Sequence, residues 1–146
     1  MRHAEIAQRL GRTEDDVART IEQMEKEKVI LGSHVIVNPD KIKDGGLIGI
    51  IEVKISPERE TGFDAIARRI YNFPEVRLCY LISGAYDLLV FVEGETLQDV
   101  AMFVSQKLAP IAHVTSTTTH FILKKYKEDG VVLDDPDSAD RLPVTP

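Results

Sequence analysis

Five consecutive residues near the middle of the chain have the chemistry needed to hold the two charged ends of a free amino acid. They are Ser83, Gly84, Ala85, Tyr86 and Asp87. Gly84 lets the backbone adopt a positive φ or approach a ligand closely, so that exposed N–H groups can hold a carboxylate. The Asp87 carboxylate can accept hydrogen bonds from an ammonium group. The alternative interpretation is an ordinary hairpin turn with a capping aspartate.

A run of hydroxyl side chains further along the chain is a second candidate for a polar site. Residues 115–119 read Thr-Ser-Thr-Thr-Thr. They could line a small polar pocket, or they could form a β-branched edge strand, for which threonine is well suited. Leu81, Ile122 and Leu123 hint at an apolar lining for a ligand pocket whose walls are shared between subunits.

The first 32 residues have the pattern of a helix-turn-helix. Ala4, Ile6, Ala7 and Leu10 have helical spacing, and Gly11 is expected to end that helix. A second helix is expected to be capped by Thr13 and to end at Gly32. In a helix-turn-helix the N-terminal residues of the second helix reach the bases in the major groove.

The candidate DNA-contacting residues lie at the start of this second helix and along its exposed side. They are Arg12, Thr13, Asp16, Arg19, Thr20 and Gln23. Acidic residues at 14–16 repel phosphates, so we expect weak, salt-sensitive DNA binding. The first helix of a three-helix core is expected to be missing, because only Met1 to His3 precede Ala4. The alternative is a degenerate helical pair used for dimer packing.

The elements that would position the candidate ligand site follow a pattern that occurs twice between residues 47 and 126. Each copy has an apolar run followed by a helix that begins near a threonine and ends at a proline. The first copy consists of segments 47–55 and 61–74, and the second consists of segments 86–92 and 96–110. Thr61 and Thr96 each have an aspartate three residues later, which is close to a capping box. A duplicated strand–helix–strand predicts one βαββαβ sandwich.

Two of the expected strands are apolar on both sides. In the strand at 86–92, Leu88, Val90 and Val92 point one way, while Leu89 and Phe91 point the other. The strand at 76–82 is nearly as apolar. Two helices can cover only one face of a four-stranded sheet, so we expect the second face to be buried against another subunit.

Composition excludes several classes of protein. The chain has 146 residues, and its contents of 43% apolar and 29% charged residues are typical of a soluble globular protein. No apolar run is long enough to span a bilayer, and we expect no signal peptide, because Met1-Arg2-His3 does not have the pattern that opens one. The single Cys79 favours a reducing cytoplasm. Most of the acidity lies in the tail at 128–146, which is expected to be disordered from Asp134 on, after a short strand at 131–133.

On these motifs the chain resembles the Lrp/AsnC family, the leucine-responsive and asparagine-operon regulators. The resemblance runs from about Ala4 to Lys127, and its most specific segments are 4–11, 24–30, 83–88 and 117–119 leading to Lys124. It implies a ferredoxin-like effector domain that dimerises through its sheets, with dimers assembling into an octamer of four dimers. It also implies an amino-acid site between dimers, at the loop matching Ser83–Asp87 and at the last strand near Thr117 and Thr119.

We therefore predict an α+β protein with a truncated winged helix-turn-helix followed by a ferredoxin-like βαββαβ domain. The expected divisions are a partial helix-turn-helix at 1–32, a linker strand and loop at 33–46, a ligand-binding and oligomerisation domain at 47–127, and an acidic tail at 128–146. The linker is expected to contain a short strand at 33–38 that ends at Pro39-Asp40.

The predicted function is that of a cytoplasmic amino-acid-responsive transcriptional regulator, which has no catalytic residues, metal or cofactor. One alternative is a stand-alone amino-acid-binding oligomer that does not bind DNA. A second is an enzyme similar to the siroheme decarboxylases, which resemble this family and bind a tetrapyrrole through histidine and arginine. His113, His120 and Arg77 are the residues that would serve there.

Overall fold

The computed structural model describes residues 3–38, 41–42, 46–56 and 62–133. These residues belong to two compact units, which divide between Val37 and Asn38. None of the helices in the described ranges is long and apolar enough to cross a membrane.

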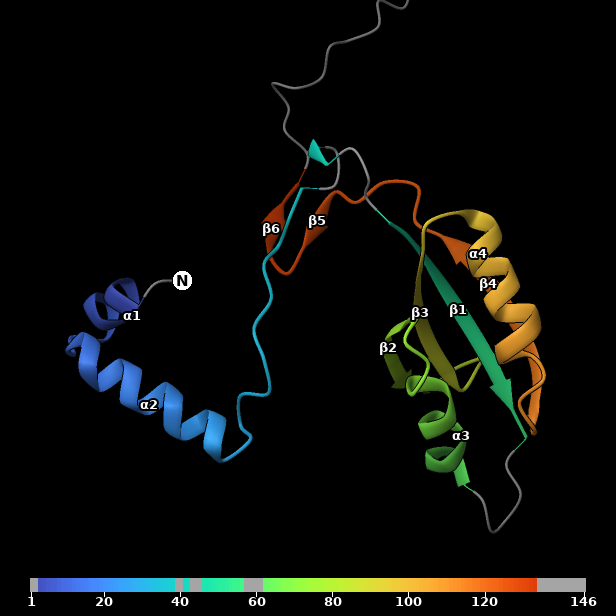
Figure 1. The fold of residues 1–146 in the computed structure, drawn as a ribbon, viewed down its shortest axis with the longest axis horizontal. Coiled ribbons are helices and arrows are strands. Elements are labelled where there is room, and N and C mark those ends of the chain that lie inside the picture. Colours follow the sequence, from blue (N-terminus) through green and yellow to red (C-terminus); the bar gives the residue numbers. More distant parts are fainter. Residues whose placement is uncertain (1–2, 39–40, 43–45, 57–61, 134–146) are drawn as a thin grey trace, which may run out of the picture. The chain divides into compact units, whose positions relative to one another are not determined.

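The first unit contains helices α1 (His3–Leu10) and α2 (Glu14–Lys26), joined by a tight turn at Gly11, whose φ is +63° (Figure 1). The Thr13 side chain accepts a hydrogen bond from the Asp16 N–H at 3.2 Å and so caps α2. Ala7 and Val17 are buried between the helices. The predicted helix–turn–helix and its cap are therefore confirmed.

Two predictions about the following segment are wrong. Helix α2 ends at Lys26 rather than Gly32, because Lys28 adopts a φ of 58° and the N–H groups of Val29 and Ile30 both donate to the Met24 carbonyl. This left-handed helix end usually selects glycine, and a lysine there gives no sequence signal. Residues 33–38 do not form a strand either, since alternating apolar residues make a strand only where a neighbouring strand accepts their hydrogen bonds. Pro39-Asp40 lies outside the described residues.

The second unit contains a four-stranded antiparallel sheet in the order β2-β3-β1-β4 (Figure 1). Its strands are β1 (Leu47–Ile55), β2 (Val76–Leu81), β3 (Leu88–Gly94) and β4 (Val114–Phe121). Helix α3 (Gly62–Tyr71) follows β1, and helix α4 (Leu97–Phe103) follows β3 and continues into a π-helical turn, η2 (Val104–Leu108). This is the predicted βαββαβ order.

Local signals explain where most of these elements begin. Thr96 forms a complete capping box with Asp99 at the start of α4, whereas Thr61 lies outside the described residues. Strand β3 begins at Leu88, so the prediction that it starts at Tyr86 is wrong; Tyr86 and Asp87 belong to the turn.

A π-helical turn determines which side chains face the core at the end of α4. The π-helical turn widens the spacing of the helix, so that Phe103 and Leu108, five residues apart, are both buried. Leu97 and Ala101 lie on other sides of the helix and are exposed.

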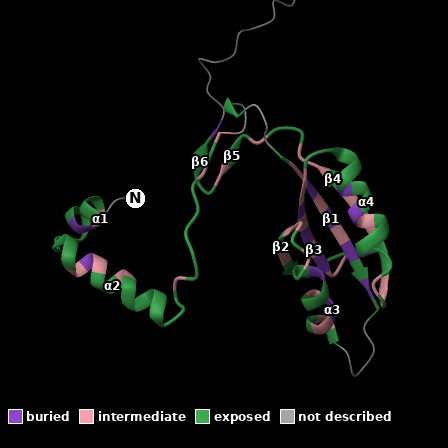
Figure 2. Cartoon of the chain, in the orientation of Figure 1, coloured by how far each residue is buried: buried purple, intermediate pink, exposed green. Residues whose placement is uncertain are grey.

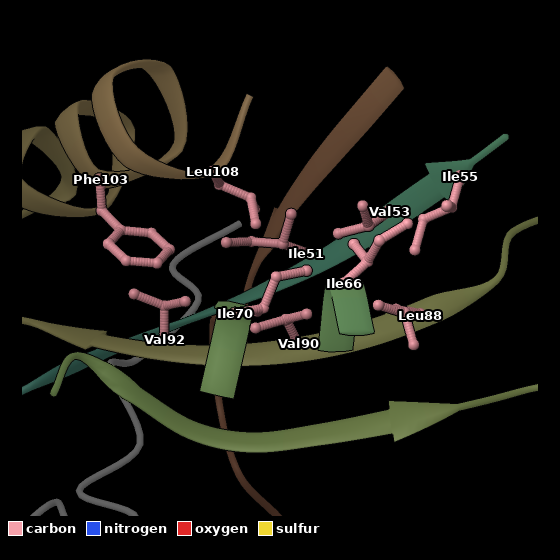
Figure 3. Close-up of a cluster of buried hydrophobic side chains, with 10 residues drawn as sticks. All are labelled: Ile51, Val53, Ile55, Ile66, Ile70, Leu88, Val90, Val92, Phe103 and Leu108. Carbon is pink, nitrogen blue, oxygen red and sulfur yellow. The ribbon is translucent and has the colours of Figure 1, made fainter. Parts of the chain in front are cut away.

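The hydrophobic core lies between the helices and one face of the sheet (Figure 3). Its strand residues are Ile51, Val53, Ile55, Leu88, Val90 and Val92, and its helix residues are Ile66, Ile70, Phe103 and Leu108. Helix α4 approaches β1 closely at Gly49, where a Cβ atom would lie 2.6 Å from Val100 Cγ1. A larger residue at this position would force the helix away from the sheet.

The other face of the sheet, called the open face below, is not covered by the described residues of the second unit. Ile48, Ile50, Leu89 and Phe91 on this face are half-buried, and Leu78 and Tyr80 are 42% and 49% exposed. Figure 2 shows that buried residues alternate with half-buried or exposed ones along β1 and β3. The buried side chains of both strands belong to the hydrophobic core. Burial of both faces therefore requires a covering surface from outside this unit.

After β4 the chain forms a small hairpin of β5 (Lys127–Glu128) and β6 (Val131–Val132). Its turn uses Asp129 and Gly130, both with positive φ, as a two-residue hairpin turn requires. The predicted short strand near residue 131 is thereby confirmed. The remainder of the acidic tail, from Asp134, lies outside the described residues.

Candidate functional site

The segment Ser83–Asp87 connects β2 to β3 and is tied to the end of β1. The Asp87 N–H donates to the Val53 carbonyl at 3.0 Å, and the Ile82 N–H donates to the Asp87 carbonyl at 2.9 Å. These bonds hold the turn against the central strand of the sheet. The turn therefore has a defined position from which its backbone can contact a ligand.

The Asp87 carboxylate has a structural partner that the sequence did not indicate. Its Oδ2 accepts a hydrogen bond from the Ile55 N–H at 2.7 Å. A β-bulge between Lys54 and Ile55 interrupts the pairing of β1 with β4, and Asp87 caps the N–H beside this irregularity. The capping-aspartate interpretation is thus realised. A carboxylate can still accept further hydrogen bonds at its other oxygen.

The other turn residues have distinct roles. Gly84 has a φ of +153°, which favours glycine, but no atom lies within 4 Å of a Cβ built there, so its role is conformational. Ser83 and Ala85 are exposed, and the Ala85 carbonyl accepts a hydrogen bond from Lys54 Nζ at 2.8 Å. The sequence gives no sign of this contact, because Lys54 and Ala85 are 31 residues apart in the chain.

Thr117 and Thr119 lie on β4, half-buried on the core side of the sheet, where they pair with Val53 and Ile51. Leu81, Leu88, Val53 and Thr117 form one row across the four strands. Leu81 and Thr117 are therefore at opposite edges, about 14 Å apart at the usual strand spacing. A single amino acid cannot contact both residues of one chain.

The two candidate lining residues Ile122 and Leu123 lie elsewhere. With Gly46, Leu47, Ile48, Lys124 and Lys125 they line a hollow of about 180 Å³. This hollow lies beyond the Phe121 end of β4, whereas the turn Ser83–Asp87 is near the opposite end of the sheet. Ile122 and Leu123 are therefore not neighbours of the turn within one chain, and their place in a pocket shared between subunits stays a prediction.

The candidate DNA-contacting residues are mainly exposed, and several of them form hydrogen bonds or ion pairs with neighbouring residues of the first unit. Arg19 Nη2 forms an ion pair with Asp16 Oδ1 at 2.8 Å, and the Thr20 hydroxyl donates to the Asp16 carbonyl. The Gln23 side chain donates to Glu27. A hydrogen bond from Thr13, assisted by the Arg19 charge, lowers the pKa of Asp16 below its ordinary value. Asp16 therefore remains negatively charged near neutral pH, and its charge neutralises that of Arg19.

The residues of the tetrapyrrole interpretation do not converge within one chain. Arg77 lies on edge strand β2 and forms an ion pair with Glu93, whereas His120 lies on the opposite edge strand β4 beside Glu52. His113 is in the turn before β4, with a φ of 73°. Among the described residues there is also no group of three or more potential ligands placed to hold a metal ion.

The geometry defines a class of protein: a helix-turn-helix unit joined to a ferredoxin-like sheet domain with a structured turn at one end of the sheet. Residues 48–132 match the family model described as the Lrp/AsnC ligand binding domain. The chain is 47% identical to YugG, an HTH-type transcriptional regulator of Bacillus subtilis, over 97% of this chain and 86% of that protein. It is 30% identical to the regulator LrpA of Pyrococcus horikoshii, covering 84% of each chain.

Solved structures show the same fold. AsnC of Escherichia coli superposes with a TM-score of 0.67 at 18% identity, covering 90% of this chain and 86% of that chain. A transcriptional regulator of Neisseria meningitidis in complex with L-Met gives 0.69 at 21% identity, covering 92% and 86%. This chain belongs to the Lrp/AsnC family. The resemblance predicted from its motifs is confirmed, and the family consists of transcriptional regulators rather than enzymes.

Proposed function

We propose that this chain is a cytoplasmic transcriptional regulator whose activity responds to a free amino acid bound at the turn Ser83–Asp87. The observation that carries the proposal is the rigid attachment of this turn to β1 through Asp87, within residues that match a ligand-binding domain. The solved relative from Neisseria meningitidis contains L-Met. The effector of this chain belongs to the same chemical class, a molecule with one ammonium and one carboxylate.

The complete site requires more than one copy of the chain. Leu81 and Thr117 occupy opposite edges of the sheet, so they can share one ligand only if the edges of two copies meet. We assign residues 47–127 to ligand binding and oligomerisation and residues 1–32 to DNA contact. Dimers form through the open face, and four dimers form an octamer with effector sites between dimers.

The proposed effector site consists of residues from the turn and the two sheet edges: Leu81, Ser83, Gly84, Ala85, Tyr86, Asp87, Thr117 and Thr119. A thermal-shift screen of the twenty amino acids tests it. A ligand at a hundred times its dissociation constant should stabilise the folded chain by about 2.7 kcal/mol. A screen in which no amino acid raises the melting temperature would remove the amino-acid response from the proposal.

DNA binding by the first unit should be weak and steeply dependent on salt. Arg12 and Arg19 are the arginines placed to contact phosphates. The ion pair with Asp16 neutralises the charge of Arg19 and so reduces its contribution. We expect Asp16→Asn to strengthen binding by removing a carboxylate and releasing Arg19, and Arg19→Ala to weaken it. Fluorescence anisotropy with duplex DNA at several salt concentrations measures both. An arginine that neutralises one phosphate contributes about 0.9 to the log–log salt slope, and its removal should lower the slope by that amount.

The same titration distinguishes the alternative, a stand-alone amino-acid-binding oligomer. The ion pair between Asp16 and Arg19 favours this alternative, because it reduces the positive charge that the helix presents. A chain that binds an amino acid but gives no anisotropy change at low salt, in either the natural or the Asp16→Asn form, would establish the alternative.

A further inference from the structure

The open face of the sheet carries a polar cluster in its apolar surface. Glu52 on β1 lies beside His120 on β4, with 3.3 Å between Glu52 Oε1 and His120 Nε2. The Tyr86 side chain also forms a hydrogen bond with Glu52. Desolvation, followed by the negative charge of Glu52, raises the pKa of Tyr86, so its hydroxyl stays protonated and can donate to the carboxylate.

Apolar side chains surround this cluster on the same face. Glu52 is next to Leu89 on β3, and His120 is next to Ile50 on β1. In the free chain the side chains of Glu52 and His120 are still 29% and 53% exposed. A second copy that covered the neighbouring apolar residues would remove the pair from water as well.

Burial has a different cost for the two charge states of this pair. A carboxylate loses its hydration on burial, and the loss is offset only when a positive charge accompanies it. A protonated His120 supplies that charge, whereas a neutral imidazole leaves Glu52 with hydrogen bonds alone. Histidine is the side chain that ordinarily changes charge between about pH 5 and 8.

We propose that the Glu52–His120 pair makes self-association through the open face depend on pH, with the protonated imidazole favouring the assembled form. The inference rests on the assembly that is part of the proposed function. Because the assembled form binds more protons at His120 than the free chain does, association is strongest below the histidine titration range. It weakens as the pH rises through that range.

Other charged or titratable groups near the pair do not produce the same effect. Lys54 lies two residues along β1, but its ammonium donates to the Ala85 carbonyl. Glu93, further along β3, pairs with Arg77. Tyrosine and lysine side chains ordinarily titrate well above this range. The facing copy contributes its own Glu52 and His120 to the same surface.

Sedimentation equilibrium of the full chain at about pH 5.5 and about pH 8, at constant ionic strength, tests the proposal. We expect the dissociation constant of the natural chain to be about tenfold larger at the higher pH, a change that corresponds to about 1.4 kcal/mol in the free energy of association. His120→Gln cannot titrate and should have nearly the same dissociation constant at both values. His34→Gln, a matched change in the first unit, should keep the natural pH dependence.

Three outcomes would overturn the inference: equal association of the natural chain at both pH values, stronger association at the higher pH, or an unchanged pH dependence in His120→Gln. The last would assign the effect to the net negative charge of the whole chain, which also falls on acidification. A chain that stays monomeric throughout would contradict the assembly itself, so the two failures can be told apart. Glu52→Gln removes the carboxylate that the imidazolium compensates, so association of this variant should no longer strengthen on acidification and should weaken where a protonated His120 is buried alone.

Discussion

An Asp87→Ala variant is expected to bind the amino-acid effector at least about tenfold more weakly than the natural chain. The substitution removes the acceptor of the Ile55 N–H, so the turn Ser83–Asp87 is attached to β1 by one hydrogen bond fewer. It also removes the carboxylate proposed to face the effector's ammonium. A hydrogen bond to a charged group contributes roughly 1.5–3 kcal/mol, which is about tenfold or more in affinity.

Asp87→Asn separates these two contributions. The amide oxygen can still accept from the Ile55 N–H, but the side chain no longer carries a negative charge. Isothermal titration calorimetry with the amino acid found in the screen measures each variant, well below its melting temperature. An equal decrease in affinity in both variants indicates a direct contact with the ammonium. A decrease in Asp87→Ala alone makes Asp87 a positioning residue, and unchanged affinity in both would move the site away from this turn.

A Phe91→Lys variant is expected to weaken self-association at least about a hundredfold. Phe91 lies on the open face, in one row with Ile50 and Leu78. A second copy packed on this row would bury the new ammonium, and the two carboxylates nearest to it on this face, Glu52 and Glu93, already pair with His120 and Arg77. An uncompensated buried charge costs about 3 kcal/mol or more. Light scattering over a range of protein concentrations measures the change.

Leu97→Lys is the matched control for this variant. Leu97 is 56% exposed at the start of α4, and it does not belong to the open face. Its replacement should leave the oligomer mass unchanged. Both variants should keep the circular dichroism spectrum of the natural chain, since Phe91 is only half-buried in the free chain. A Phe91→Lys protein with unchanged mass would show that copies associate through another surface.

The sequence predicted the elements whose signals are local. The apolar run at 47–55 coincides with β1, and Thr96 with Asp99 marks the start of α4. The turn at Gly11 and the cap at Thr13 likewise define the two N-terminal helices. Periodicity, capping and glycine turns act over a few residues, so they can be recognised without knowledge of the rest of the fold.

Tertiary structure decided the features that depend on distant contacts. The sequence identified Asp87 as a functional candidate, but its bond to Ile55 depends on a β-bulge opposite β4. The end of α2 depends on a left-handed lysine, and the inward face at the end of α4 depends on a π-helical turn. Each of these is a backbone arrangement that many residue types tolerate, so composition and spacing do not specify it.

The candidate site shows the same division. The sequence alone determined the family, the turn at Ser83–Asp87 and the hydroxyl strand at 115–119. Only the sheet order placed Leu81 and Thr117 at opposite edges, and only the strand register brought Glu52 beside His120 on the open face. Strand order and register are set by hydrogen bonds between segments far apart in the chain, and these pairings determine which side chains meet.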